Sequence, residues 1–157
     1  MKYFVLLLLS TQLCLSQDYF GFISHWEGIR TNSYTCSQGF KTVGVGHRVV
    51  EGEKCENLTS EEVFALFEKD LAIAESHARK VILNFENRLT IVKLICVDLI
   101  YNLGPTGFNK FKKTIKACND YDYVLMSEEL KNSLWYLQAG RRSKHHVYKL
   151  GKLNYEK

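Results

Sequence analysis

The stretch from Glu27 to His47 constrains the fold of this chain more than any other segment. It begins with a carboxylate at the end of a short amphipathic segment, turns at Ser37-Gln38-Gly39 and ends in the alternating run from Thr42 to His47. The valines of this run suit a half-buried strand, and its glycines leave room for another backbone or a ligand to lie against it. We therefore predict a helix followed by a β-hairpin.

Residues 1–16 have the pattern of a secretory signal peptide. Lys2 precedes the apolar run from Tyr3 to Leu9, and the small residues Cys14 and Ser16 permit cleavage before Gln17. The unbroken apolar part is much shorter than the ~20 residues that a membrane-spanning helix needs. We expect a secreted protein, extracellular or in the lumen of a digestive compartment, with no membrane partner after cleavage.

The mature chain, residues 17–157, has the size of a single domain with enough apolar content for one core. Once Lys2 is removed, 20 basic residues face 17 acidic ones, a formal charge of +3. This excess is mild and gives little information about partners. We expect a monomer with no nucleic-acid partner.

An even number of cysteines survives cleavage: Cys36, Cys55, Cys96 and Cys118. In an oxidising compartment, four cysteines indicate two disulfides with three possible connectivities, among which the sequence does not choose. A metal site is not indicated, because the chain has no Cys-x-x-Cys pair and adjacent His145 and His146 point to different faces of a helix. We expect no metal and no cofactor.

Helical spacing of apolar residues begins directly after the leader. The pattern from Asp18 to Arg30 predicts a short helix that places Glu27 one turn from Ile23 and close to Trp26. Such apolar surroundings favour the protonated form of a carboxyl group.

A second helix begins with a capping box, in which Thr59 is the N-cap and Glu62 follows three residues later. Its apolar pattern continues for more than twenty residues, to about residue 83. A helix of this length is suited to join two lobes with a cleft between them.

The segment from Leu89 to Leu103 is apolar nearly all round, which predicts a buried central helix. Gly104-Pro105 should end it, and further helices are predicted at about 108–118, 123–137 and 142–150, with Gly151 as the last stop. From charge alone, the basic cluster within residues 141–146 is interpreted as a solvated helix face.

The spacing of Glu27, eight residues, Cys36, five residues and Thr42, followed by Val-Gly-Val-Gly-His, resembles the catalytic segment of the phage-type (T4-like) lysozymes. These are the endolysin muramidases of glycoside hydrolase family 24. The capped helix from Thr59, the Tyr-Asn-Leu-Gly turn at Tyr101 and the Trp-Tyr pair at Trp135 follow in the expected order. The resemblance implies a two-lobed α+β fold, with a small hairpin lobe at about 17–58, a connecting helix at about 59–83 and a helical lobe at about 84–157.

The resemblance also implies an activity, hydrolysis of the β-1,4 bond between N-acetylmuramic acid and N-acetylglucosamine, and roles for matching residues. Glu27 is then the general acid that protonates the leaving oxygen, Cys36 stands where many relatives have aspartate, and Thr42 positions the attacking water. Residues implied to line the saccharide site are Arg48, Tyr101, Asn102, Thr114 and Arg142. Arg142 would hold Glu27 by a charge-assisted hydrogen bond or meet an acidic peptide stem.

Two of these positions have alternative interpretations. Cys36 is a thiol that positions water, a thiolate nucleophile, or half of a structural disulfide, most simply with Cys55. His47 is interpreted as structural, and Asp70 on the long helix is its expected partner.

The first functional interpretation is a secreted muramidase that binds and hydrolyses peptidoglycan for bacterial lysis, defence or digestion. The second is a lysozyme-like peptidoglycan binder that has lost hydrolysis at Cys36. The third is a membrane-exported phage endolysin that retains residues 3–15 as an anchor, in which Cys14 exchanges disulfides with Cys36.

Overall fold

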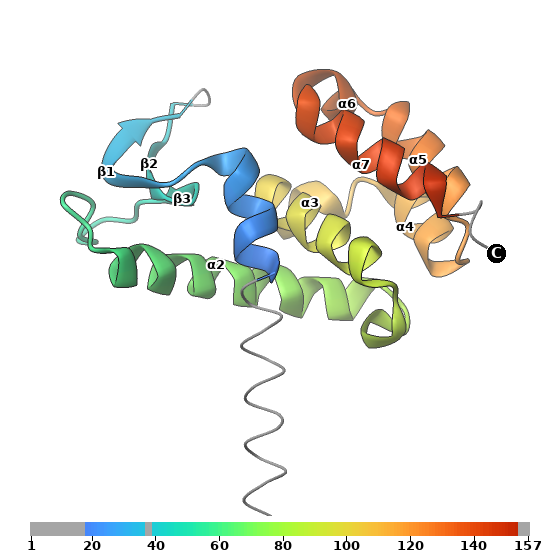
Figure 1. Ribbon diagram of the computed structural model, residues 1–157, viewed down its shortest axis with the longest axis horizontal. Helices are drawn as coiled ribbons and strands as arrows, with labels where there is room; N and C mark the ends of the chain where they lie inside the picture. The colour runs from blue at the N-terminus through green and yellow to red at the C-terminus, as the bar shows by residue number, and fades with distance from the viewer. Residues whose placement is uncertain (1–17, 37–38, 154–157) are drawn as a thin grey trace, which may run out of the picture. The chain divides into compact units, whose positions relative to one another are not determined.

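The computed structural model describes residues 18–36 and 39–153 (Figure 1). The predicted signal peptide, with Cys14, and residues 37 and 38 of the predicted turn lie outside these ranges. The chain divides into two compact units at a boundary between Ile73 and Ala74. We call them the strand unit and the helical unit.

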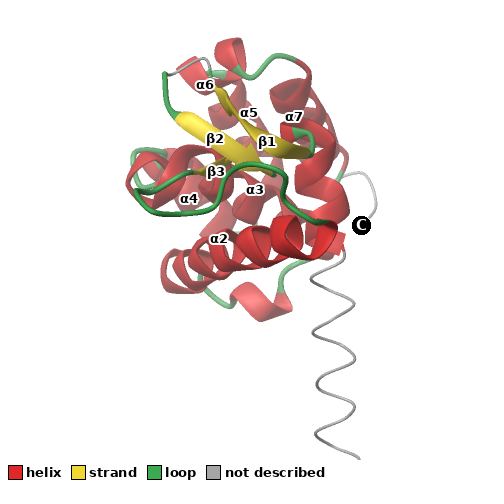
Figure 2. Ribbon diagram, turned by 90° about the vertical axis from the view of Figure 1, so that its left-hand side faces the viewer, coloured by secondary structure: helices red, strands yellow, loops and turns green. Residues whose placement is uncertain are grey.

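The strand unit begins with a helix at residues 18–27, as predicted, although the helix ends before Arg30. Three strands follow: β1 (Arg30–Thr35), β2 (Lys41–Gly44) and β3 (His47–Arg48). They form an antiparallel sheet in the order β1-β2-β3 (Figure 2). The predicted hairpin is therefore present, and a third strand that was not predicted extends it.

The second strand of the hairpin, β2, ends at Gly44, although the alternating pattern continues to His47. Gly44 has φ +65° and Gly46 has φ +73°, a left-handed backbone that glycine adopts without steric cost. The chain therefore turns at Val45 and Gly46, and His47 returns to pair with Val43. A pattern of alternating residues does not reveal this turn, because glycine is compatible with both a strand and a turn.

The long helix is α2 (Ser60–Val81), and its capping box forms as predicted. The backbone N–H of Glu62 donates to Thr59 Oγ1 at 3.2 Å, and the backbone N–H of Thr59 donates to Glu62 Oε2 at 2.8 Å. In the strand unit, the ring of Phe20 lies 5.4 Å from that of Phe64 and 5.0 Å from that of Phe67, between centroids. These contacts pack the first helix against the start of α2.

The helical unit contains the end of α2 and a series of shorter elements: η1 (Phe85–Asn87), α3 (Thr90–Phe108), α4 (Lys112–Asn119), α5 (Tyr123–Lys131), α6 (Leu134–Gln138) and α7 (Arg141–Lys152). Helix α5 packs against both α4 and α7. The single helix predicted at 123–137 is wrong, because Ser133 starts a new helix by accepting a hydrogen bond from the backbone of Tyr136. The predicted stop at Gly151 is also wrong, since α7 continues to Lys152.

Helix α3 is the buried helix predicted for this unit. Its backbone breaks at Gly104, which has φ +70° and ψ 164°, and one further turn follows from Pro105. Among the described residues, α3 alone is long and apolar enough to cross a membrane by length and composition. Its side chains from Ile95 to Ile100 are all buried, which accounts for that composition. The predicted α+β class is confirmed.

Candidate active site

The carboxylate of Glu27 lies against the backbone turn that joins β2 to β3. Glu27 is the last residue of the first helix and is partly buried. A Cβ atom at Gly46 would lie 3.0 Å from Glu27 Oε2 and 3.2 Å from its Cδ. The glycines of this run were predicted to leave room for another backbone or a ligand. At Gly46 the Glu27 carboxylate occupies that room, because glycine has no side chain there.

Tyr34 belongs to the same site and was not predicted from the sequence. Burial, and after it the negative charge of Glu27, raise the pKa of Tyr34, and Cys36 adds to the effect. The phenol therefore keeps its proton and remains a hydrogen-bond donor. Tyr34 lies two residues before Cys36, and side chains two apart on a strand point to the same face. This spacing could have indicated Tyr34 as a neighbour of Cys36 from the sequence.

Thr42 lies in the central strand, opposite Tyr34 on β1 and Arg48 on β3. Its side chain is buried, and its hydroxyl donates to the carbonyl oxygen of Phe40 at 3.0 Å. Because the proton is used in this bond, the oxygen lone pairs remain to accept a hydrogen bond from another group. Arg48 is exposed, and its guanidinium lies 3.8 Å from the centroid of the Phe40 ring.

Cys36 directly follows β1 and is partly exposed. Its backbone N–H donates to Phe40 O at 2.9 Å, and its carbonyl accepts from the N–H of Gly39 at 2.9 Å. These bonds fix the backbone at this position. The strand unit thus holds the three predicted catalytic residues, Glu27, Cys36 and Thr42, and one predicted binding residue, Arg48.

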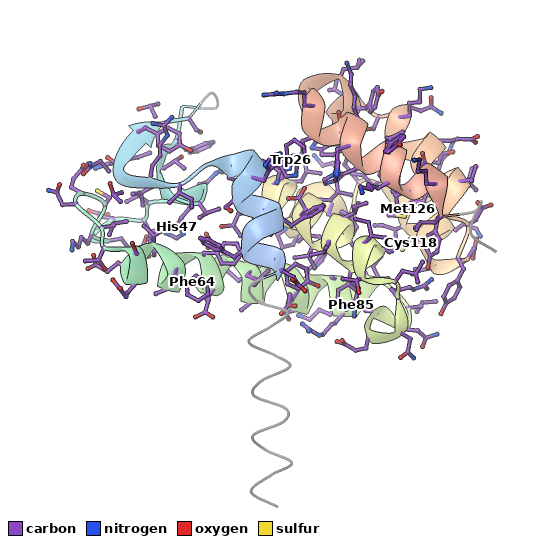
Figure 3. The ribbon with its side chains drawn as sticks, viewed as in Figure 1. Trp26, His47, Phe64, Phe85, Cys118 and Met126 are labelled. Carbon is purple, nitrogen blue, oxygen red and sulfur yellow. The ribbon has the colours of Figure 1, made fainter. Side chains whose placement is uncertain are left out.

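His47 joins β3 to α2 and to the turn that follows β3. Its Nδ1 lies 2.8 Å from Asp70 Oδ2, and its Nε2 lies 2.9 Å from Glu53 Oε2. The expected pairing of His47 with Asp70 is confirmed. Figure 3 shows His47 between the strands and α2, where it ties the turn that contacts Glu27 to a rigid helix.

The predicted residue Arg142 lies in the helical unit and is bound to a buried carboxylate. Its Nε donates to Asp98 Oδ2 at 2.8 Å and its Nη2 to Asp98 Oδ1 at 2.6 Å, while His146 Nε2 lies 2.6 Å from Asp98 Oδ2. Burial raises the pKa of Asp98, but the hydrogen bonds from His146 and Arg142 outweigh it and hold that pKa below its usual value. The interpretation of residues 141–146 as a solvated face is wrong for Arg142 and His146, which are buried and bound to Asp98.

Asn102 is linked to this cluster through aromatic side chains. Its Oδ1 accepts a hydrogen bond from Trp135 Nε1 at 3.0 Å, and the Trp135 ring lies 5.7 Å from that of His146. Tyr101 is partly buried beside Asn102, just before the break in α3. Asp98 was not predicted from the sequence. A single acidic residue within an apolar helix was the feature that could have indicated it.

Thr114 lines a pocket of about 360 Å³ in the helical unit. This volume is in the range of small-molecule sites. The pocket is lined by Lys110, Phe111, Lys112, Lys113, Thr114, Glu129, Asn132 and Ser133. Of the predicted saccharide-binding residues, its lining includes Thr114 alone. Three lysines against one glutamate make the pocket basic.

The strand unit presents a combination suited to acid catalysis. It holds the Glu27 carboxyl group against a turn, the Tyr34 phenol, which keeps its proton, and the buried Thr42 hydroxyl, whose lone pairs are available. This combination supplies a proton donor and a means to orient water.

Comparison with known proteins agrees with this chemistry. The profile of the phage lysozyme family matches residues 24–149. The chain is 26% identical over 142 residues to probable T4-type lysozyme 2 of Dictyostelium discoideum, covering 74% of this chain and 84% of the relative. It is 27% identical over 143 residues to probable T4-type lysozyme 1 of the same organism, with the same coverage.

Proposed function

Because the chain belongs to the phage lysozyme family, whose members are muramidases that act on peptidoglycan, we propose that it is a secreted muramidase used in defence against bacteria or in their digestion. The reaction is hydrolysis of the β-1,4 bond between N-acetylmuramic acid and N-acetylglucosamine. The observation that carries the proposal is the Glu27 carboxylate lying against Gly46, at the start of a motif that matches the family's catalytic segment.

Glu27 is the general acid in this proposal. It gives its proton to the glycosidic oxygen as the bond to the anomeric carbon breaks, and a water oxygen then bonds to that carbon. The water releases one proton to the solvent as this bond forms, and the Glu27 carboxylate takes up a proton from the solvent before the next cycle. Thr42 accepts a hydrogen bond from this water, since its own proton is held by Phe40 O. The Cys36 thiol helps Thr42 to orient this water.

The basic pocket at Thr114 is proposed to contact the wall polymer. The peptide stems of peptidoglycan carry carboxylates, and lysines at 110, 112 and 113 complement that charge. Replacing both Lys110 and Lys113 with alanine should raise KM for peptidoglycan and leave kcat nearly unchanged. An unchanged KM would remove the pocket from the substrate site.

The central test is clearing of peptidoglycan suspensions by the purified protein and by a Glu27→Gln variant. Glu51→Gln is the matched control, because it removes the same charge from an exposed turn of the strand unit. We expect the parent and Glu51→Gln to clear at equal rates, and Glu27→Gln to be at least about 100-fold slower. Clearing by Glu27→Gln at the parental rate would contradict the assignment of Glu27.

Two further readouts separate the alternatives. A parent protein that sediments with peptidoglycan but releases no reducing ends would be a binder without hydrolysis. N-terminal sequencing of the protein from a secreting host tests the leader, and Gln17 at the terminus is the expected result. Retention of residues 1–16 in the membrane fraction would favour the exported endolysin.

A further inference from the structure

Two cysteines meet in the core of the helical unit, whereas the residues assigned to catalysis belong to the strand unit. Cys96 on α3 and Cys118 on α4 are both fully buried, with their sulfur atoms 4.0 Å apart. Figure 3 labels Cys118 among the helices of this unit. A disulfide has a sulfur–sulfur length of about 2.05 Å, so the two sulfur atoms must approach by about 2 Å to form one.

A buried arginine accompanies the two thiols. Arg88 donates from Nε and Nη2 to the carbonyl oxygen of Leu83 at 3.0 and 2.8 Å, and its guanidinium lies 3.5 Å from the centroid of the Tyr121 ring. Its Nη1 is buried and donates to no group of the described residues. A buried cation with an unused donor stabilises a nearby thiolate.

The two thiols differ in their readiness to ionise. A hydrogen bond from Cys96 lowers the pKa of Cys118, burial acts against this, and the charge of Arg88 lowers it further. The same hydrogen bond raises the pKa of Cys96. Cys118 is therefore the first nucleophile of the pair, and Cys96 is the thiol that completes an exchange.

We propose that Cys96 and Cys118 form a disulfide that joins α3 to α4 when the protein meets a low-molecular-weight disulfide such as oxidised glutathione. The Cys118 thiolate attacks one glutathione sulfur and releases one glutathione thiolate, which leaves a mixed disulfide. Cys96 then gives up its proton, attacks the Cys118 sulfur and releases the second glutathione. Two protein thiols are oxidised, and one glutathione disulfide is reduced to two thiols.

Because both sulfurs are buried, the exchange takes place during folding or in a local opening of α4. The resulting loop of about 23 residues constrains the unfolded chain and raises the folding equilibrium constant by about 300-fold. The pairing also excludes two of the three connectivities open to four cysteines. Cys36 is then left to act as a thiol or to pair with Cys55.

The test is peptide mapping of the purified full chain after exposure to a glutathione redox buffer and alkylation. Trypsin cuts after Lys93, Lys110, Lys116 and Lys131, so the disulfide links peptide 94–110 to peptide 117–131. We expect this linked pair in the parent protein and in Cys55→Ala, and a higher Tm for the oxidised form of each than for its reduced form.

Cys96→Ala is the informative variant, because it keeps Cys118 and removes only its partner. It should give no linked pair and should carry glutathione on Cys118 instead, with no rise in Tm. The proposal is overturned if peptides 94–110 and 117–131 of the parent remain alkylated separately, or if either is linked to a peptide that contains Cys36 or Cys55. The readout does not depend on hydrolysis, so it holds even if the protein proves to be a binder.

Discussion

His47 Nδ1 lies 2.8 Å from Asp70 Oδ2, so the shortest strand of the sheet is anchored to the long helix by one imidazole. A second carboxylate, Glu53, lies 2.9 Å from the opposite ring nitrogen, and Lys69 lies 2.7 Å from its other oxygen. With both ring nitrogens facing carboxylates, the imidazolium form donates two hydrogen bonds. This anchor holds the turn at Gly46, and through it the surface against which Glu27 lies.

His47→Asn should lower the stability of the protein by about 2 kcal/mol and leave kcat of the folded fraction unchanged. The hydrogen bond to Asp70, helped by Glu53, raises the pKa of His47 above 6.5. The stabilisation is therefore full below pH 6.5 and is lost as pH rises through the higher pKa of the folded state. Hydrogen bonds from His47 and Lys69 lower the pKa of Glu53 from 4.5 to about 2, so its contribution is present above pH 4.5 and is lost as pH falls toward 2.

Chemical denaturation of parent and variant at a series of pH values measures this difference. It should be largest between about pH 4.5 and 6.5 and should shrink above that window. A selective loss of kcat in His47→Asn, with parental stability, would make His47 part of the catalytic chemistry.

Gly46→Ala should reduce activity by about 10-fold or more, because the new methyl group would lie 3.0 Å from Glu27 Oε2 and displace the carboxylate. The left-handed backbone at this position adds about 1 kcal/mol of strain. Gly52→Ala is the matched control, since Gly52 has φ +85° and open space around the added carbon. Equal losses of stability with an activity loss only in Gly46→Ala would support the contact, and equal activity in the two variants would contradict it.

Three substitutions distinguish a Cys36 thiol that orients water from a Cys36 that forms a structural disulfide with Cys55. Cys36→Asp should keep activity within a few-fold of the parent, because a carboxylate at this position orients water as the thiol does. Cys36→Ala should lose about 10-fold or more. Cys55→Ala should have parental rates and Tm. A loss in Cys55→Ala as large as that in Cys36→Ala, with a lower Tm in both, would instead assign Cys36 to a structural disulfide with Cys55.

Asp98→Asn should destabilise the protein by about 3–5 kcal/mol, because it leaves the buried guanidinium of Arg142 without a compensating charge and removes the carboxylate partner of His146. Asp120→Asn is the control, an exposed acid of the helical unit paired with Lys116, and it should cost less than about 1 kcal/mol. Equilibrium unfolding in urea at pH 7 distinguishes them. Similar costs for the two variants would mean that the Asp98 cluster contributes no more than a surface pair.

Much of this protein is determined by its sequence through short-range interactions. The capping box of Thr59 and Glu62 and the break at Gly104 each involve residues only a few positions apart or a single backbone conformation, so their geometry follows from local chemistry. The spacing of Glu27, Cys36 and Thr42 likewise identified the family and the α+β fold.

The tertiary structure decided what depends on packing between distant segments. Glu27 meets Gly46 only because β2 turns back into β3, so that His47 pairs with Val43 and the turn lies against the end of the first helix. Arg142 reaches Asp98 across 44 positions of sequence, so its burial depends on how α7 packs on α3. Cys96 and Cys118 are likewise neighbours only in the folded helical unit. Residue spacing determines local backbone geometry, while packing determines which side chains share one site and which charges lose their water.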